Sequence, residues 1–230
     1  MRRTCLTIGL VLMAFSGLPA AWSNEAKLLK VAAPLHSPPF IDLTKKTGIE
    51  MTKIERWARK LGYRLDWQHF PPKRNRRLVK NGEVDMAIRL TKDLNSDVCY
   101  TGPYISFQNL AVYKDASVRI QSIDDLSRYS VVAFQNAREA LGSQYREAVG
   151  RSPFYLEIPD QERQLDILYK RENQVLVIEK TIFQHFKDKL YPDRISLTAA
   201  IFPVTSYSLA FRDPKLCQAF DKLIAADPAP

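Results

Sequence analysis

The feature that most limits the possible folds is a regular alternation of short apolar runs with longer segments of helical periodicity. Residues 28–34 (LLKVAAP) have the composition of a short strand, and residues 63–70 (YRLDWQHF) alternate as a strand does. Between them, apolar residues recur at helical spacing and predict a helix with one buried face. These residues are Met51, Ile54, Trp57, Ala58 and Leu61. The order strand, helix, strand predicts a parallel βαβ unit.

The ends of this first helix carry their own signals. Thr47 and Glu50 have the spacing of a capping box, in which each side chain bonds the backbone of the other, so we expect the helix to begin there. Gly62 is expected to end it.

The alternation continues to the C-terminus. Expected helices cover residues 73–81, 122–127, 136–149, 160–171, 180–190 and 213–224, and expected strands cover residues 84–90, 130–134, 154–158 and 175–179. Two extended segments, residues 106–113 and 203–211, separate two α/β units. The pattern predicts an α/β protein with two lobes linked by a pair of strands.

The first 23 residues have the layout of a secretory signal peptide. Two arginines precede an apolar run, and small residues follow it. An uncleaved anchor would need about 20 continuous apolar residues, and this run is broken by Ser16, Gly17 and Pro19. Cys5 lies too early to be a lipid-attachment site. We therefore expect cleavage near Ser23 and a soluble periplasmic product.

The charge of the exported chain limits its partners. Removing Arg2 and Arg3 from 34 basic residues leaves 32 against 25 acidic ones, a formal charge of 32 − 25 = +7. This excess is compatible with an anionic ligand, with a membrane surface or with ordinary surface charge. The basic run at residues 73–77 (KRNRR) would suggest nucleic acid in a cytosolic chain, but export argues against a nucleic-acid partner.

The motifs of metal sites and common enzymes are missing from the sequence. The histidines His36, His69 and His185 have no metal-ligand spacing. We found no G-x-S-x-G turn and no glycine-rich phosphate loop. Cys99 and Cys217 form no C-x-x-C pair; they are compatible with one disulfide or with two buried thiols. We expect no metal, no cofactor and no enzymatic activity.

An ordered set of segments resembles a known family. The segments are LKVAAPLHSPPF, TGIEMTKIERWARKLGYRLDW, NGEVDMAI, YTGPY, SIDDLSRYSVVAF and SYSLAFRDPKLCQAFDKLI. Together they resemble the bacterial extracellular solute-binding proteins of family 3. The resemblance implies a type II periplasmic binding fold with a two-strand hinge and a ligand closed between the lobes. One lobe would contain residues 24–110 and 205–230, and the other residues 111–204.

The stretch NGEVDMAIRLT places an arginine at the end of an apolar strand. In open α/β sheets, ligands bind outside the carboxyl ends of the strands, so Arg89 is expected to face the cleft. Its guanidinium can hold a carboxylate bidentately, which makes it the first candidate for an anionic part of the ligand. The alternative is an arginine that reaches solvent from a strand end.

Further candidates come from the same geometry and from matching family positions. In the first lobe they are His36, Phe40, Arg74 and Thr91, and in the second lobe Gln135, Asn136 and Glu179. Phe40 would stack on the ligand or pack in the core, and Arg74 would face the cleft or solvent. Backbone N–H groups at Gln135 and Asn136 could bind an anion. Glu179 matches the acid that pairs with an α-amino group in amino-acid receptors of the family.

Two departures from the family leave the solute open. The family's Thr-Pro-x-Arg motif reads TKDLNSD here, with Leu94 at the arginine's place, and the usual Gly-Ser/Thr turn reads FQNA. The solute could be a modified amino acid, a small peptide or another organic acid. We expect a monomer that hands this solute to a membrane permease of the ABC type. The alternatives are a stand-alone sensor and a dehydratase-like enzyme with Glu179 as the acid.

Overall fold

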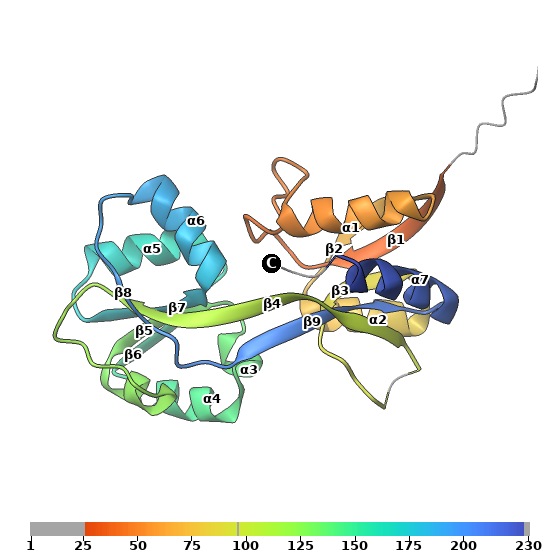
Figure 1. Ribbon diagram of the computed structural model, residues 1–230. Coiled ribbons are helices and arrows are strands. Elements are labelled where there is room, and N and C mark those ends of the chain that lie inside the picture. Colours follow the sequence, from red (N-terminus) through yellow and green to blue (C-terminus); the bar gives the residue numbers. More distant parts are fainter. Residues whose placement is uncertain (1–25, 96, 228–230) are drawn as a thin grey trace, which may run out of the picture.

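Two α/β lobes lie side by side and are linked by two long strands. The computed structural model describes residues 26–95 and 97–227, so the predicted signal segment, residues 1–23, lies outside them. The linking strands are β4 (Cys99–Tyr113) and β9 (Val204–Phe211), which run together from one lobe to the other (Figure 1). The predicted α/β architecture with a two-strand hinge is confirmed. Within the described residues, we found no helix with the length and apolar character that membrane crossing requires.

The first lobe is built on three parallel strands, followed in the sheet by β9, which is antiparallel to β3, and then by β4, which is antiparallel to β9. The parallel strands have the order β2 (Tyr63–His69), β1 (Lys27–Ala33), β3 (Met86–Leu90). Its helices are α1 (Ile49–Lys60), α2 (Pro72–Asn81) and α7 (Pro214–Ala225). The βαβ unit predicted from the sequence is therefore present.

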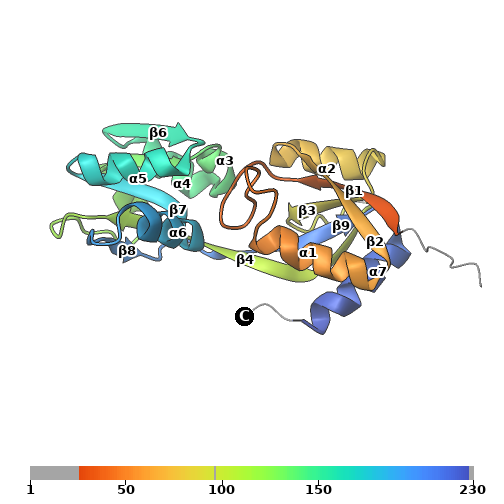
Figure 2. The same ribbon diagram turned by 90° about the horizontal axis from the view of Figure 1, so that it is seen from above.

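Helices cover both faces of the first lobe's sheet because successive strand residues point to opposite sides. Val31 belongs to the core that contains the apolar faces of α1 and α7, whereas its neighbour Ala32 packs in the cluster that contains Leu78 and Val79 of α2. Figure 2 shows α2 on one side of the sheet and α1 with α7 on the other. Strands buried on both faces explain the nearly continuous apolar runs in the sequence.

The second lobe repeats this arrangement. Its parallel strands have the order β7 (Gln174–Glu179), β5 (Ser130–Phe134), β6 (Phe154–Ile158), and the second half of β4 pairs with β7 in the antiparallel sense. A short strand that the sequence did not predict, β8 (Leu197–Ala199), also pairs with β4. Core residues of α5 (Gln161–Lys170) and α6 (Lys180–Leu190) pack on one face. Those of α3 (Ala137–Ala140), α4 (Gly142–Gly150) and the 3-10 helix η1 (Ile123–Arg128) pack on the other.

The predicted capping box of the first helix is wrong. The residue before α1 is Gly48, and no side chain caps the helix. Thr47 instead pairs with Asp42 through two backbone hydrogen bonds of 2.7 and 3.1 Å. A Cβ at Gly48 would lie 2.0 Å from the carbonyl oxygen of Phe40, so only glycine fits there. Glu50 is free of a capping role, and its side chain turns into the protein interior.

The helix predicted over residues 136–149 is divided into two. The helix α3 ends at Ala140, and α4 begins at Gly142, whose φ of 88° lies in the left-handed region. A right-handed helix cannot continue through that conformation, so the chain changes direction there. The apolar spacing alone did not reveal the break, because residues on both sides contribute to one core cluster.

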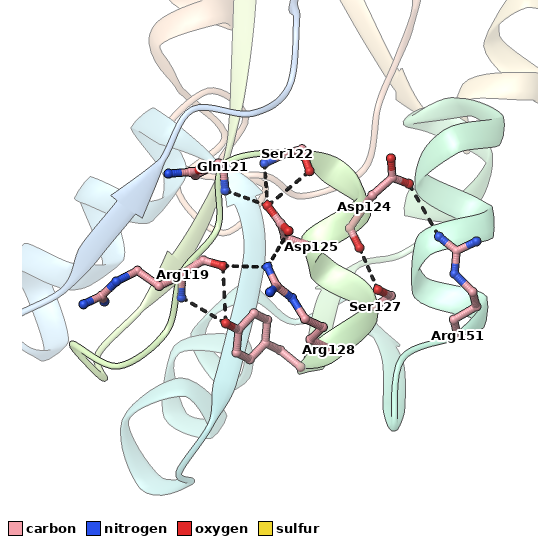
Figure 3. A network of polar contacts seen from close by, with 9 residues as sticks. Arg119, Gln121, Ser122, Asp124, Asp125, Ser127, Arg128 and Arg151 are labelled. Carbon is pink, nitrogen blue, oxygen red and sulfur yellow. Dashed lines mark hydrogen bonds and ion pairs between the residues drawn. The ribbon is translucent and has the colours of Figure 1, made fainter.

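The predicted short helix after Ser122 is confirmed, and a capping network holds it. Asp125 accepts hydrogen bonds of 2.9 Å from the backbone N–H groups of both Gln121 and Ser122 (Figure 3). Arg128 forms an ion pair with the same carboxylate. The backbone N–H group of Gln121 holds the pKa of Asp125 below its ordinary value, assisted by the backbone N–H and hydroxyl groups of Ser122 and by the charge of Arg128.

A disulfide resolves the alternatives left open for the two cysteines. Cys99, at the start of β4, is bonded to Cys217 in α7, 118 residues later in the sequence. The covalent loop contains the whole second lobe and both linking strands. The bond therefore anchors the first-lobe end of the hinge to the last helix of the chain.

We expect the disulfide to contribute strongly to stability. A loop of this length lowers the entropy of the unfolded chain, and the chain-entropy model gives about 4 to 5 kcal/mol. The double variant Cys99→Ala/Cys217→Ala should unfold at a correspondingly lower guanidinium concentration. A reducing agent should lower the midpoint of the wild type to that of the variant and leave the variant unchanged. Equal midpoints for the oxidised wild type and the variant would contradict this assignment.

The substitution Asp125→Asn should lower the free energy of unfolding by about 1 kcal/mol at neutral pH, because it removes a charged hydrogen-bond acceptor at the start of a helix. The pKa of Asp125 is lowered by folding, so its contribution is present above the unfolded-state pKa of about 3.9 and is lost as the pH falls through the folded-state value. Urea unfolding at pH 7 and at pH 3 measures this difference. The exposed Asp193→Asn is the control; a loss that is the same at both pH values would argue against the capping role.

Candidate functional site

A buried ion pair lies at the end of β3 in the first lobe, where the sequence predicted a ligand contact of Arg89. The Nε atom of Arg89 donates to Oε2 of Glu50 at 3.1 Å, and its Nη2 atom contacts the same carboxylate more closely. The side chain of Glu50 is fully buried, and that of Arg89 is 11% exposed. Nη1 of Arg89 donates to Oγ of Ser37 at 3.1 Å. The guanidinium is therefore directed into the first lobe rather than out to solvent.

The backbone of Arg89 has an unusual conformation that the same cluster holds in place. Its φ is 57°, in the left-handed region that few non-glycine residues adopt, and the pairing of β3 with β9 is irregular between Ala87 and Leu90. The Arg89 N–H group donates to the hydroxyl of Tyr104 in β4 at 3.0 Å. The Tyr104 hydroxyl in turn donates to Oε1 of Glu50. The strand thus bends at Arg89 and turns its side chain onto Glu50.

Aromatic rings enclose the guanidinium from the side of the linking strands. The centre of the Arg89 guanidinium lies 4.7 Å from the ring centre of Phe107 and 5.6 Å from that of Phe40. Phe107 also contacts Phe40 and Tyr207, with ring centres 4.7 and 5.3 Å apart. Phe107 comes from β4 and Tyr207 from β9, so β4 contacts the guanidinium directly and β9 packs against it through Phe107.

The electrostatics of the cluster fix its protonation state. Burial alone would lower the pKa of Arg89, but the charge of Glu50 and the hydrogen bonds between them raise it overall. Burial, reinforced by the nearby Glu50 charge, raises the pKa of the Tyr104 hydroxyl well above its ordinary value. Arg89 therefore stays charged, and Tyr104 stays protonated and able to donate to Glu50.

In the second lobe, a carboxylate of the chain binds Asn136, one of the two residues whose N–H groups were predicted to hold an anion. Glu157 at the end of β6 accepts hydrogen bonds from the backbone N–H groups of Asn136, at 2.7 Å, and Arg138, at 3.0 Å. The Tyr155 hydroxyl donates to it at 2.7 Å. Burial would raise the pKa of Glu157, but these three donors outweigh it and hold the pKa below its ordinary value. The predicted binding of an anion at Gln135 and Asn136 stays a prediction, and an incoming anion would meet Glu157 there.

The predicted acid of the second lobe also has partners in the protein. Glu179 precedes α6, and its Oε2 accepts hydrogen bonds from the N–H groups of Thr181, at 2.7 Å, and Ile182, at 2.9 Å. The residue is 6% exposed, and burial raises its pKa although these N–H groups act in the opposite direction. Glu179 is thus the cap of α6, and its contact with a ligand amine stays a prediction.

Two further candidates of the first lobe, His36 and Phe40, contact other residues of that lobe. Nδ1 of His36 accepts a hydrogen bond from Leu43 N at 3.1 Å, which closes the loop after β1. Phe40 is 5% exposed and packs in the aromatic group described above. Their roles in ligand binding stay predictions.

The other two lie at the first turn of α2 and just after β3. Arg74 lies over the ring of Phe70, 4.3 Å from its centre. The hydroxyl of Thr91 accepts a hydrogen bond from Nη2 of Arg76 at 3.1 Å. Both candidates are exposed side chains with a neighbour in the first lobe, and their contacts with a ligand also stay predictions.

One polar contact joins the lobes away from the hinge. Nζ of Lys73 in α2 lies 2.9 Å from Oε1 of Glu139 in α3. Both side chains are exposed, so solvent screens this ion pair and it adds little stability. It does establish that the first turn of α2 faces α3 across the space between the lobes.

The sequence interpretation missed three residues of the site: Glu50, Tyr104 and Glu157. Glu50 was assigned to a helix cap, and its position next to the buried Met51 was the only sign that it faces inward. Tyr104 and Glu157 lie in strands where alternation was too weak to show their direction. In the described residues, His, Cys, Asp and Glu side chains form no group of three that could hold a metal ion.

Arg89→Met should destabilise the protein by about 3 to 5 kcal/mol, since it leaves Glu50 buried without a cation. The double variant Arg89→Met/Glu50→Gln should lose markedly less free energy of unfolding than Arg89→Met, because no unpaired buried charge remains. Urea unfolding measures both, and the exposed Arg74→Met, which should lose no more than about 0.5 kcal/mol, is the control. A double variant no more stable than Arg89→Met would contradict the ion-pair account.

Comparisons with known proteins agree with this architecture. The sequence pattern of the bacterial extracellular solute-binding proteins, family 3, matches residues 29–226. Among curated proteins, no sequence matches significantly.

Solved structures with the same fold include three that represent different roles. The GluR0 ligand-binding core in complex with L-glutamate has a TM-score of 0.70 at 17% identity, over 87% of this chain and 92% of that one. The amino acid ABC transporter substrate-binding protein AbpA from Streptococcus pneumoniae, bound to L-arginine, has a TM-score of 0.65 at 20% identity, over 86% and 88%. The ancestral amino acid-binding protein AncCDT-1, a precursor of cyclohexadienyl dehydratase, has a TM-score of 0.64 at 17% identity, over 86% and 88%. At these identities the likeness establishes the fold.

Proposed function

The chain belongs to the bacterial extracellular solute-binding proteins of family 3, and on that premise we propose that it captures a small polar or charged solute reversibly by closing its two lobes. The family is extracellular or periplasmic, and we propose the periplasm as the location, reached through a cleaved signal peptide. The lobes would contain residues 24–110 with 205–230, and residues 111–204.

The observation that carries this proposal is the two-strand connection between the lobes. β4 and β9 pair from Ile105 to Gln108 on one strand and from Val204 to Tyr207 on the other. Domain closure of this type needs only a few residues that change their backbone angles. A pair of strands that passes from the sheet of one lobe into the sheet of the other meets that requirement.

The local geometry of the strands supports bending there. The pairing of β4 with β9 is irregular between Tyr100 and Pro103 and again between Pro103 and Ile105. Irregular pairing bends a strand and increases its twist. A hydrogen bond of 2.9 Å between the hydroxyls of Ser106 and Ser206 keeps the two strands together beyond these points. The hinge would therefore move as one unit.

We propose that the solute lies between the lobes, outside the carboxyl ends of the parallel strands. The candidate contacts are the residues expected from the sequence: His36, Phe40, Arg74, Arg89, Thr91, Gln135, Asn136 and Glu179. Tyr207, the partly exposed member of the aromatic group, would add apolar surface on the side of the linking strands.

The closed protein would act as a monomer that delivers its solute to a membrane permease. A sensor role uses the same capture and differs in its membrane partner, as the likeness to the GluR0 ligand-binding core illustrates. A dehydratase-like enzyme is the other alternative. Its acid would be Glu179, whose raised pKa suits proton donation, but the carboxylate is engaged as the cap of α6. We therefore propose binding without catalysis.

A solute screen tests this function. Residues 24–230 would be mixed with amino acids, small peptides, amines and organic acids, and thermal unfolding would be followed. A solute at 100 times its Kd should stabilise the protein by about 2.7 kcal/mol. The same solute should reduce the radius of gyration measured by X-ray scattering, because the lobes close. Conversion of a compound to product would favour the enzyme, and stabilisation without compaction would contradict hinge closure.

A further inference from the structure

Two positions that the sequence suggested for an anionic part of the ligand each contact a carboxylate of the protein. In the first lobe, Glu50 forms an ion pair with Arg89. In the second lobe, Glu157 accepts hydrogen bonds from the backbone N–H groups of Asn136 and Arg138. We infer that the receptor selects solutes with no free carboxylate, namely amides and amines of amino-acid size. This inference rests on the proposed function and narrows its solute class.

The first-lobe position is neutralised by a carboxylate that cannot leave easily. Glu50 is 1% exposed and receives donors from both Arg89 and Tyr104. A ligand carboxylate that displaced it would leave a buried charge without its cation, which costs several kcal/mol. A ligand carboxylate that bound beside it would be attracted by Arg89 and repelled by Glu50 at nearly the same distance. In neither arrangement would the ligand carboxylate bind as strongly as it would to an arginine without an internal partner.

The second-lobe position is filled in a similar way. Glu157 takes two backbone N–H groups and the hydroxyl of Tyr155, which are the donors an incoming carboxylate would use. Its pKa is held below the ordinary value, so it carries a negative charge at neutral pH. A second carboxylate at this place would face a like charge and would find its donors already used.

What remains available in the cleft suits a neutral or cationic group. The ionised Glu157 can accept from an amide N–H or an ammonium group without giving up its backbone donors, because a carboxylate has about four lone-pair sites. The rings of Phe40 and Phe107 are buried against the Arg89 guanidinium, and of this aromatic group Tyr207 is the partly exposed member. A carboxamide or an amine has an N–H group to donate to Glu157, whereas a carboxylate group has none.

Paired probes test the inference. L-amino acids would be compared with their own carboxamides and with the amines formed by removing the carboxyl group, each by titration calorimetry on residues 24–230. We expect the amides or amines to bind roughly tenfold or more tightly than the matching acids. Acids that bind as tightly as their amides would overturn the inference and leave the proposed function intact. If no probe of any class binds, the proposed function fails and the inference fails with it.

A substitution checks that Glu157 is responsible. Glu157→Gln keeps the shape of the side chain and removes its charge, so the preference for an amide over the matching acid should fall by roughly tenfold. Glu147→Gln, at an exposed glutamate of α4, makes the same charge change and should leave the preference unchanged. Circular dichroism would establish that both variants fold. A preference unaffected by Glu157→Gln would overturn the assignment of Glu157 as the excluding charge.

Discussion

The ion pair of Arg89 and Glu50 is the interaction on which the cleft side of the first lobe depends. It joins β3 to α1, and through Ser37 and Tyr104 it also reaches the loop after β1 and the linking strand β4. Because Glu50 has no exposed surface, the pair must be complete for the lobe to be stable. It also holds Arg89 in a backbone conformation that the residue would not otherwise adopt. One buried carboxylate thus sets the position of several elements that meet near the hinge.

The same principle, in which a charge of the chain is matched by another group of the chain, recurs in the second lobe. Glu157 accepts hydrogen bonds from backbone N–H groups at the start of α3, and Glu179 accepts them from backbone N–H groups at the start of α6. The fold is shared with proteins that bind glutamate or arginine, but fold alone does not determine a ligand. In this chain, Arg89 and the backbone N–H group of Asn136, which the sequence suggested for an anionic ligand, have carboxylate partners within the protein.

Much of the fold was predictable because its signals are local and periodic. The strand that contains Val31, the apolar face of α1 around Trp57 and the capped helix after Ser122 all follow from spacing within a few residues. The site was less accessible, since its decisive contacts join residues far apart in sequence. Glu50 and Arg89 are 39 residues apart, and nothing local distinguishes a buried glutamate from a helix cap. The strand β8 was missed because its pairing with the distant β4 defines it, and the division at Gly142 was missed because the apolar spacing continues across the glycine.

The central place of β9 in the sheet has a consequence for the order of folding. β9 lies between β3 and β4, yet its residues are made after the whole second lobe. A chain that has emerged only as far as residue 203 therefore contains all of the second lobe's parallel strands, but its first lobe has two unpaired strand edges where β9 belongs. Contacts between residues so distant in sequence form slowly. The second lobe is thus able to assemble first, and the first lobe is completed only when the last strand enters its middle and joins the two halves of its sheet.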